Sequence, residues 1–289
     1  MEYSLNNGKI SISIIEKGAE LRSLKKIDID EEYMWEADPK YWGKKSPVLF
    51  PFVGEINNGK YTYKGKEYKM TKHGFSRDCK FEMIEKSDKT ITFLLESNEE
   101  TKKMYPFDFE FYIKYILTND GVDIQYKVIN KTAGEMYFSI GGHPAFSTPT
   151  NENIRYEDYY LEFNKNENQK IYMLDGAFVG EEKKDFLNNE NKILLKKNIF
   201  DNDALIFENL TSNIVTLKNT KNTRQLELDF TGFPYLAFWA VPGASYVCIE
   251  PWYGIADFVK ANNKIEEKKG MQRLGKDEKF ESKIEIKIS

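Results

Sequence analysis

The stretch FWAVPGASYVCIEPWYG, residues Phe238–Gly254, has the composition of a buried strand and contains one acidic residue, Glu250. Tyr246, Cys248 and Glu250 recur at every second position, so they share one face of the predicted strand. Pro251 lacks the backbone N–H that a strand donates within a sheet, and we therefore expect Glu250 to be the last paired residue. The stretch predicts a strand inside a sheet that ends in a carboxylate.

The carboxylate of Glu250 has two interpretations. At the rim of an apolar sheet its charged form is poorly hydrated, which raises its pKa toward the range that suits a general base. The alternative is structural, because a Glu at this position can also cap the strand or pair with a lysine. The stretch alone favours neither interpretation.

Many other segments alternate apolar and polar residues, as antiparallel strands with one solvated face do. Aromatic residues make up 15% of the chain, which favours sheet over a helix bundle. The predicted strands are residues 9–15, 18–24, 60–68 (a hairpin), 90–95, 109–117, 122–128, 159–163, 214–217, 226–230, 235–239 and 283–288. This succession of short strands predicts an all-β fold, a large antiparallel β-sandwich.

Two segments lack this pattern. Residues 150–200 are rich in Asn, Lys and Glu, and apart from residues 159–163 we interpret them as long surface loops or an insertion. Residues 254–261 are the best candidate for a helix. No linker rich in Gly, Pro or Ser marks a boundary, so we predict one domain over residues 1–289.

Composition limits the classes of function. The formal net charge of −4 gives no electrostatic case for binding nucleic acid or an anionic membrane. The first residues lack the basic and apolar parts of a signal peptide, and we expect a cytoplasmic protein. Cys79 and Cys248 have no metal-ligand spacing and are interpreted as ordinary buried thiols. The sequence does not decide between a monomer and a homodimer.

The chain has only two histidines, and each lies in a tight loop beside glycine. His73 is in KHGFSRD and His143 is in SIGGHPAF. Such loops can present an imidazole to a ligand, although a lone His is often structural. A metal site would need a carboxylate as third ligand, and no His or Cys cluster indicates one. Nucleotide-binding glycine motifs are absent too, so we predict neither a metal nor a cofactor.

Five short motifs occur in a characteristic order along the chain. They are LFPFVG (49–54), HGFSR (73–77), GGHPAF (141–146), DNDAL (201–205) and CIEPWYG (248–254). Together they resemble the motifs of the aldose 1-epimerase (galactose mutarotase-like) superfamily, nearest to its LacX-like branch. The resemblance runs almost from end to end and implies a β-supersandwich with a sugar site in a concave face.

The resemblance also implies roles for individual residues. Glu250 stands at the position of the family's general base, and His143 at that of its general acid, which would be protonated near neutral pH. His73 matches the second histidine, which binds and polarises the sugar. Asp203 matches the acidic residue that contacts sugar hydroxyls, with Asp201 and Asp229 as alternatives.

Substrate-binding residues are less fully matched. An arginine usual in the first motif region of the family has no counterpart here, and Arg77 is the candidate replacement, as in the similar HGFxR motif of the hexose-6-phosphate epimerase branch. Trp239 and Trp252 are candidates to stack on the apolar face of a sugar, the alternative being core packing.

Three functions remain open on the sequence. The first is a cofactor-independent mutarotase acting on a hexose, or a hexose-6-phosphate 1-epimerase. The second is a non-catalytic carbohydrate-binding protein on the same fold. The third is a glycoside-processing enzyme, which would need a second carboxylate beside Glu250, such as Asp203. A sugar or sugar phosphate is the expected small-molecule partner in all three.

Overall fold

The computed structural model describes all residues, 1–289, and its largest element is a nine-stranded antiparallel sheet. Its strands are β8 (Glu82–Lys86), β9 (Thr90–Glu96), β10 (Phe109–Leu117), β11 (Gly121–Asn130), β15 (Tyr159–Asp175), β16 (Phe178–Leu194), β18 (Ile214–Asn219), β19 (Gln225–Asp229) and β23 (Lys279–Ile288). They lie in the order β16-β15-β18-β19-β23-β11-β10-β9-β8. Alternate residues of β10 and β11 are buried, as expected for a sheet with one face on the core.

A second, six-stranded sheet carries the sequence stretch that ends in Glu250. Its strands are β5 (Val48–Leu49), β13 (Ile140–Gly142), β14 (Ala145–Ser147), β17 (Leu205–Glu208), β20 (Tyr235–Trp239) and β21 (Tyr246–Tyr253). β21 is central, with β20 on one side and β13 and β14 in succession on the other. All but the last residue of β21 are buried, because side chains of this strand are covered on both faces.

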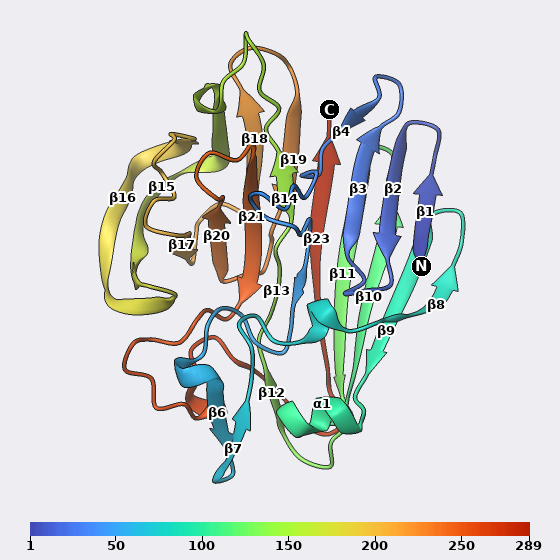
Figure 1. The fold of residues 1–289 in the computed structure, drawn as a ribbon, viewed down its shortest axis with the longest axis vertical. Helices are drawn as coiled ribbons and strands as arrows, with labels where there is room; N and C mark the ends of the chain where they lie inside the picture. The colour runs from blue at the N-terminus through green and yellow to red at the C-terminus, as the bar shows by residue number, and fades with distance from the viewer.

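Smaller elements complete the fold. They are β1 (Glu2–Asn6), β2 (Ile10–Ile15), β3 (Leu21–Lys26), β4 (Glu31–Glu32), β6 (Lys60–Tyr63), β7 (Lys66–Lys69), β12 (Met136–Phe138), β22 (Gln272–Leu274), helix α1 (Glu99–Met104) and 3₁₀ turns at Asn57–Gly59, Ser76–Asp78, Tyr156–Asp158 and Ile265–Glu267. In Figure 1, β1–β4 and the sheet of β21 lie side by side in front of the large sheet. One hydrophobic core joins these three larger sheets, so the predicted antiparallel β-sandwich is confirmed. Neither α1 nor any 3₁₀ turn is long and apolar enough to cross a membrane.

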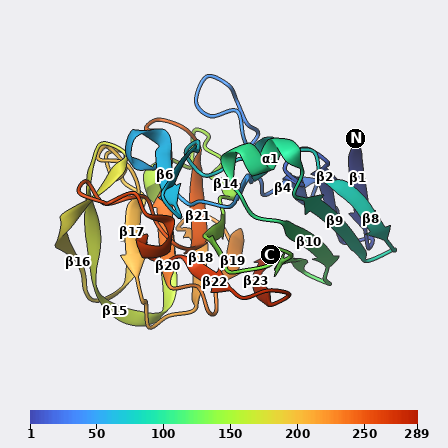
Figure 2. The ribbon, with the colours of Figure 1, turned by 90° about the horizontal axis from the view of Figure 1, so that it is seen from below.

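The prediction of surface loops over residues 150–200 is wrong. β15 and β16 form a hairpin of two 17-residue strands, which makes up one end of the molecule (Figure 2). Most side chains in the outer half of this hairpin are exposed, so apolar alternation is lost beyond residue 163. The expected helix at 254–261 is also absent, and the one α-helix begins instead at Glu99, where the Asn98 side chain accepts hydrogen bonds from Glu100 and Thr101.

The expectation that pairing ends at Glu250 is wrong as well. Pro251 pairs with Leu236 of β20, and the strand continues to Tyr253. The N–H of Ile249 points to the other side, where it donates to Pro144. Because backbone groups alternate sides along a strand, the missing donor of Pro251 faces that same side, at the break between β13 and β14. A proline is tolerated there because no ladder partner is lost.

Candidate active site

The break between β13 and β14 places His143 opposite Glu250. Gly141 pairs with Trp252 on one side of the break and Ala145 pairs with Cys248 on the other, in the same register. That register sets His143 directly across from Glu250, and their Nε2 and Oε2 atoms are 3.3 Å apart. Gly141 is required for the close approach, because a Cβ there would lie 2.4 Å from the Trp252 ring. The two side chains that the sequence nominated as acid and base are therefore neighbours.

His73 reaches the same place from a strained loop. Its backbone has a φ of 67°, and the next residue, Gly74, has a φ of 73°. A Cβ on Gly74 would lie 2.2 Å from the carbonyl oxygen of Phe50, so only glycine fits. His73 Nδ1 accepts a hydrogen bond from Gly54 N at 3.1 Å, which leaves the proton on Nε2 as a donor. The ring centroids of His73 and His143 are 5.7 Å apart.

These groups line a pocket of about 260 Å³, here called the site pocket. Its lining residues are Trp42, Gly54, Lys72, His73, Arg77, His143, Leu174, Ala177, Asp203, Ala204, Ile206, Trp239, Glu250, Trp252 and Ala256. All six residues proposed from the sequence as catalytic or substrate-binding are among them, as is the further candidate Trp252.

Trp42 is a lining residue that the sequence analysis missed. Its ring stacks on the imidazole of His143, with centroids 4.8 Å apart and an interplanar angle of 27°. Trp239 meets the same imidazole edge-on at 5.8 Å. The two indoles hold the ring of His143 from two directions. The aromatic-rich composition of residues 33–42 was the available signal, but nothing in it pointed to His143.

Burial dominates the charge state of the pair. The side chain of Glu250 is 1% exposed, and loss of hydration raises its pKa well above the usual value, with Lys72 opposing and Asp203 adding to the rise. Burial lowers the pKa of His143 to about 3, with Arg77 among the cations that add to the effect. Burial likewise lowers the pKa of His73, and a proton on His143 would lower it further. Burial therefore acts against the expected protonation of His143 near neutral pH and favours the proton on Glu250.

The three acidic candidates differ in their position relative to the site pocket. Asp203 lines the site pocket, where its Oδ1 accepts a hydrogen bond from the N–H of Ala204 at 2.8 Å, and its backbone has a φ of 68°. Asp201 is not among the lining residues. Asp229 is engaged elsewhere, since its Oδ1 accepts from the backbone of Thr231 at 2.7 Å. Of the three, Asp203 alone is placed to contact a ligand in the site pocket.

Arg77 and Lys72 bring positive charge to the pocket. A terminal nitrogen of Arg77 donates to the carbonyl oxygen of Lys72 at 2.8 Å, and its Nε lies 3.7 Å from a carboxylate oxygen of Asp78. That Nε is buried without a hydrogen-bond partner. Lys72 was not proposed from the sequence, where it precedes His73 without any special pattern. Together the two cations can receive an anionic or hydroxyl-rich ligand.

The site also contains a mixed set of potential metal ligands. His143, Cys248 and Glu250 offer a nitrogen, a sulfur and an oxygen within 4.8 Å of one another. Burial raises the pKa of the Cys248 thiol well above its usual value, and it does the same for Glu250. A metal binds such groups in their deprotonated forms, and burial works against the deprotonation of both.

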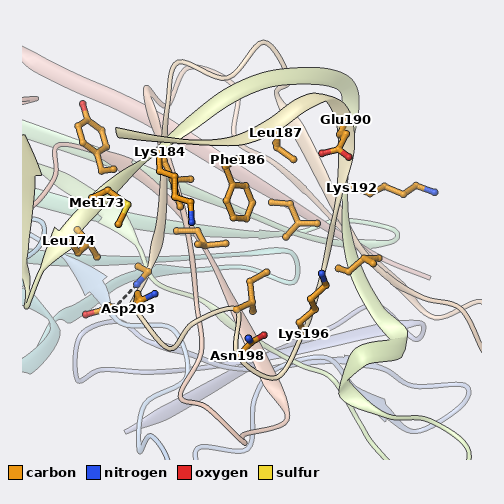
Figure 3. A pocket seen from close by; sticks show the side chains of 18 residues that line it. Met173, Leu174, Lys184, Phe186, Leu187, Glu190, Lys192, Lys196, Asn198 and Asp203 are labelled. Carbon is orange, nitrogen blue, oxygen red and sulfur yellow. Dashed lines mark hydrogen bonds between the residues drawn. The ribbon is translucent and has the colours of Figure 1, made fainter. Parts of the chain in front are cut away.

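A second cavity of about 700 Å³ adjoins the site pocket beneath the β15–β16 hairpin (Figure 3), and we call it the hairpin cavity. Leu174, Asp203 and Ala204 line both cavities. Asp203 is thus at the boundary between them. Sequence analysis gave no sign of this cavity, because it had assigned residues 150–200 to surface loops.

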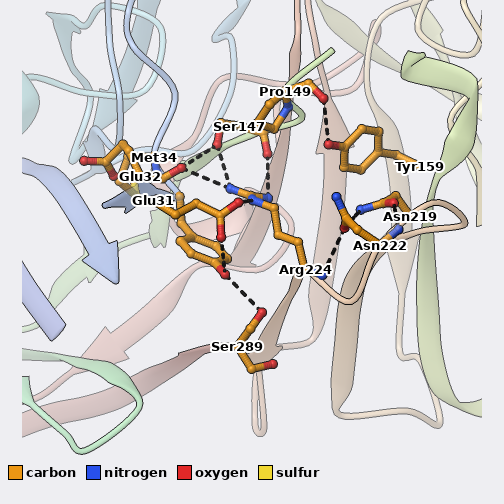
Figure 4. A network of polar contacts seen from close by, with 11 residues as sticks. Glu31, Glu32, Met34, Ser147, Pro149, Tyr159, Asn219, Asn222, Arg224 and Ser289 are labelled. Atoms are coloured by element: carbon orange, nitrogen blue, oxygen red, sulfur yellow. Dashed lines mark hydrogen bonds and ion pairs between the residues drawn. The ribbon is translucent and has the colours of Figure 1, made fainter. Parts of the chain in front are cut away.

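Arg224 anchors the strand that follows His143 (Figure 4). Its guanidinium donates to the backbone and side-chain oxygens of Ser147 at 3.1 and 2.9 Å and to Glu31 at 2.8 Å. It also lies 4.0 Å from the ring centroid of Tyr33. Arg224 is buried, and these bonds tie the end of β14 to the segment after β3. The anchor fixes β14 and so contributes to the position of the break that carries His143.

Comparison with known proteins agrees with this architecture. Residues 1–287 match the family model described as Aldose 1-epimerase. The chain is 32% identical over 278 residues to Protein LacX, plasmid, of Lactococcus lactis subsp. lactis, with 93% of each chain covered.

Solved structures agree as well. A galactose mutarotase related enzyme from Lactobacillus acidophilus superposes with a TM-score of 0.96 and 38% identity, over 100% of this chain and 97% of the other. A galactose mutarotase-like protein from Lactobacillus casei ATCC 334 gives a TM-score of 0.95 and 28% identity, over 100% of both chains. The galactose mutarotase-like fold expected from the motifs is confirmed. The chain belongs to the aldose 1-epimerase family.

Proposed function

We propose that the protein is a cofactor-independent aldose 1-epimerase, an isomerase that interconverts the α and β anomers of a hexose. The observation that supports this most is the His143–Glu250 pair, 3.3 Å apart in a pocket of about 260 Å³. The C1 hydroxyl oxygen and the ring oxygen of an aldopyranose are both bonded to C1. Two groups that exchange protons with these oxygens must be neighbours, as this pair is.

In the proposed reaction, Glu250 takes the proton of the C1 hydroxyl while His143 gives a proton to the ring oxygen. The bond between C1 and the ring oxygen breaks, and C1 becomes the carbonyl carbon of the open-chain aldehyde. Rotation about C1–C2 presents the other face of the carbonyl. Closure then reverses both proton transfers, so the pair returns to its starting protonation and no cofactor is consumed.

When the ring opens, the pair must hold one proton in total. The carboxylate of Glu250 must be deprotonated and the imidazole of His143 protonated. Burial instead favours the proton on Glu250. The reactive form follows from transfer of this proton over the 3.3 Å between the two groups. We propose that sugar hydroxyls donating to the carboxylate, and the charge of Lys72 nearby, favour that form.

The remaining residues orient the sugar. His73, whose Nε2 carries the proton, is a donor for the ring oxygen or a neighbouring hydroxyl. Asp203 is an acceptor for hydroxyls. Trp239 offers an aromatic surface to the apolar face of the ring.

A hexose 6-phosphate is a second candidate substrate. The observation that favours it is the meeting of Lys72 and Arg77 at the site pocket, with the Nε of Arg77 lacking a hydrogen-bond partner. Guanidinium groups bind phosphate oxygens strongly. A neutral hexose would instead bind these two cations through its hydroxyl groups. Direct assay of hexoses and hexose 6-phosphates distinguishes the two substrates.

The test is anomer exchange measured by NMR or polarimetry on pure anomers of glucose, galactose and their 6-phosphates. The proposal expects acceleration for at least one of these sugars, with loss of the 6-phosphate activity alone in Arg77→Ala if the phosphate is recognised there. If no sugar in the panel is exchanged faster than in buffer but one binds, the protein is the non-catalytic sugar-binding alternative.

A further inference from the structure

Four of the seven buried side-chain atoms that lack a hydrogen-bond partner belong to residues of the site pocket. They are Nε of Arg77, Nδ1 of His143, Oε2 of Glu250 and Nε1 of Trp252. Buried polar atoms in proteins are nearly always hydrogen-bonded, so each of these needs an explanation. Trp252 offers a donor and nothing else, whereas the carboxyl oxygens of Glu250 are acceptors. An unpaired donor and an unpaired acceptor thus occur in the same pocket.

Trp252 is a neighbour of Glu250 because both belong to β21. Residues two apart in a strand project from the same face of the sheet, so these two side chains lie next to each other. The ring of Trp252 shares a small hydrophobic cluster with Ile206 and Tyr235, and the residue is only 5% exposed. Little of its surface is left to stack on a sugar. Its indole N–H remains as the group that can act in the site.

Gly141 fixes the edge of the indole that carries this N–H. It pairs with Trp252 across β13 and β21, and a Cβ at Gly141 would lie 2.4 Å from Cδ1 of the ring. Cδ1 is bonded to Nε1, so the polar edge of the indole lies against the glycine. Strand pairing and the missing side chain at Gly141 together hold the donor in place beside Glu250.

The indole also acts on the charge of Glu250. Burial is the largest influence on the pKa of Glu250 and raises it, whereas the N–H of Trp252, as a hydrogen-bond donor, lowers it. A hydrogen bond to an ionised acceptor is about twice as strong as one to a neutral acceptor. The carboxyl group has enough lone pairs to accept from Trp252 while it exchanges a proton with His143, 3.3 Å away.

We propose that Trp252 is a positioning residue whose indole N–H donates a hydrogen bond to the carboxyl group of Glu250. A small adjustment of the two side chains pairs both atoms at once, and this removes the cost of leaving each buried without a partner. The bond orients the carboxylate and stabilises its charge while the proton is on His143. The inference rests on the proposed function, in which Glu250 is the general base, and it adds a donor that the chain itself supplies.

The first experiment compares the indole N–H signals of the four tryptophans in wild type and in Glu250→Leu by ¹H–¹⁵N NMR. Trp252→Phe identifies the signal of Trp252. Leucine has about the size of glutamate but accepts no hydrogen bond, so the Trp252 signal should move upfield in Glu250→Leu. Trp35 is the internal control, because its N–H donates to the carbonyl oxygen of Trp42 at 2.9 Å and should keep its position.

A Trp252 signal that moves no more than that of Trp35 would overturn the inference. This comparison requires no catalysis and is therefore independent of the proposed function. A wild-type protein that exchanges no anomers would contradict the proposed function, and the NMR signals would still decide whether Trp252 bonds to Glu250.

The second experiment measures anomer exchange by Trp252→Phe, which keeps an apolar ring and removes the donor. Because the bond is strongest when the carboxylate is charged, its loss should lower kcat about tenfold and change KM by less than about twofold. Trp239→Phe is the matched control, since it makes the same substitution at the tryptophan that we assign to sugar binding in the same pocket. It should raise KM more than it lowers kcat.

An unchanged kcat in Trp252→Phe would contradict the inference. A change in KM alone would contradict it too, because it would mean that Trp252 contacts the sugar and does not act through Glu250.

Discussion

His143→Gln should flatten the acid dependence of stability, because the pKa of His143 is lowered from about 6.5 to about 3 in the folded protein. Below pH 6.5 the unfolded chain binds a proton at this histidine, and the folded chain does not until about pH 3. The unfolded state thus holds more protons, and the free energy of unfolding falls as the pH falls through this window. Between about pH 7 and about pH 5.5 the loss due to His143 is about 1.3 kcal/mol.

Urea unfolding of wild type and His143→Gln at these two pH values measures the effect. Glu250 acts in the opposite direction, since its raised pKa contributes stability that is lost as the pH rises above about 4.5. His73 acts in the same direction as His143. Both residues remain in the variant, so the comparison removes the titration of His143 together with its effect on the pKa of His73. A wild type that loses no more stability than the variant, within about 0.3 kcal/mol, would show that His143 titrates normally and would refute the reasoning.

Three other variants test the geometry of the site. Gly74→Ala should destabilise the protein by at least about 2 kcal/mol in urea unfolding, because its Cβ would meet the Phe50 carbonyl at 2.2 Å in a left-handed backbone conformation; a smaller loss would mean that the loop adapts. Arg224→Met should cost about 3 kcal/mol in the same assay, because it leaves the carboxylate of Glu31 and the oxygens around Ser147 without their partner. Trp42→Ala should lower kcat/KM for every accepted sugar about tenfold, because it removes the ring that stacks on the imidazole of His143, our proposed general acid; an unchanged kcat/KM would show that Trp42 does not contribute to the reaction.

The sequence predicted the parts of the fold in which burial alternates. Residues 109–117 and 122–128 have one face on the core, and they form β10 and β11 as expected. The β15–β16 hairpin was missed because its outer half mixes buried residues such as Ile171 and Val179 with long exposed runs, so burial does not alternate regularly along the strands. Pairing through Pro251 was missed because it depends on a break in the neighbouring strand, far away in sequence.

The candidate site was predicted as a set of residues but not as an arrangement. Short motifs identified His73, His143 and Glu250, whereas the 3.3 Å approach of the last two depends on the register of β13 and β14 against β21. The lowered pKa of His143 was not predicted, because its depth of burial is a property of the whole fold. Trp42 belongs to the site because the fold stacks its ring on His143, and the distance between the two residues in the sequence does not predict this contact.

The most direct test of the central claim is anomer exchange by Glu250→Gln. Glutamine has the shape of glutamate but cannot take up or release the proton, so the fold should persist while ring opening loses its base. We expect the acceleration of anomer exchange to fall by about 10²–10⁴-fold, with sugar binding and the circular dichroism spectrum unchanged. A Glu250→Gln variant that exchanges anomers at close to the wild-type rate would contradict the assignment of Glu250 and His143 as the catalytic pair.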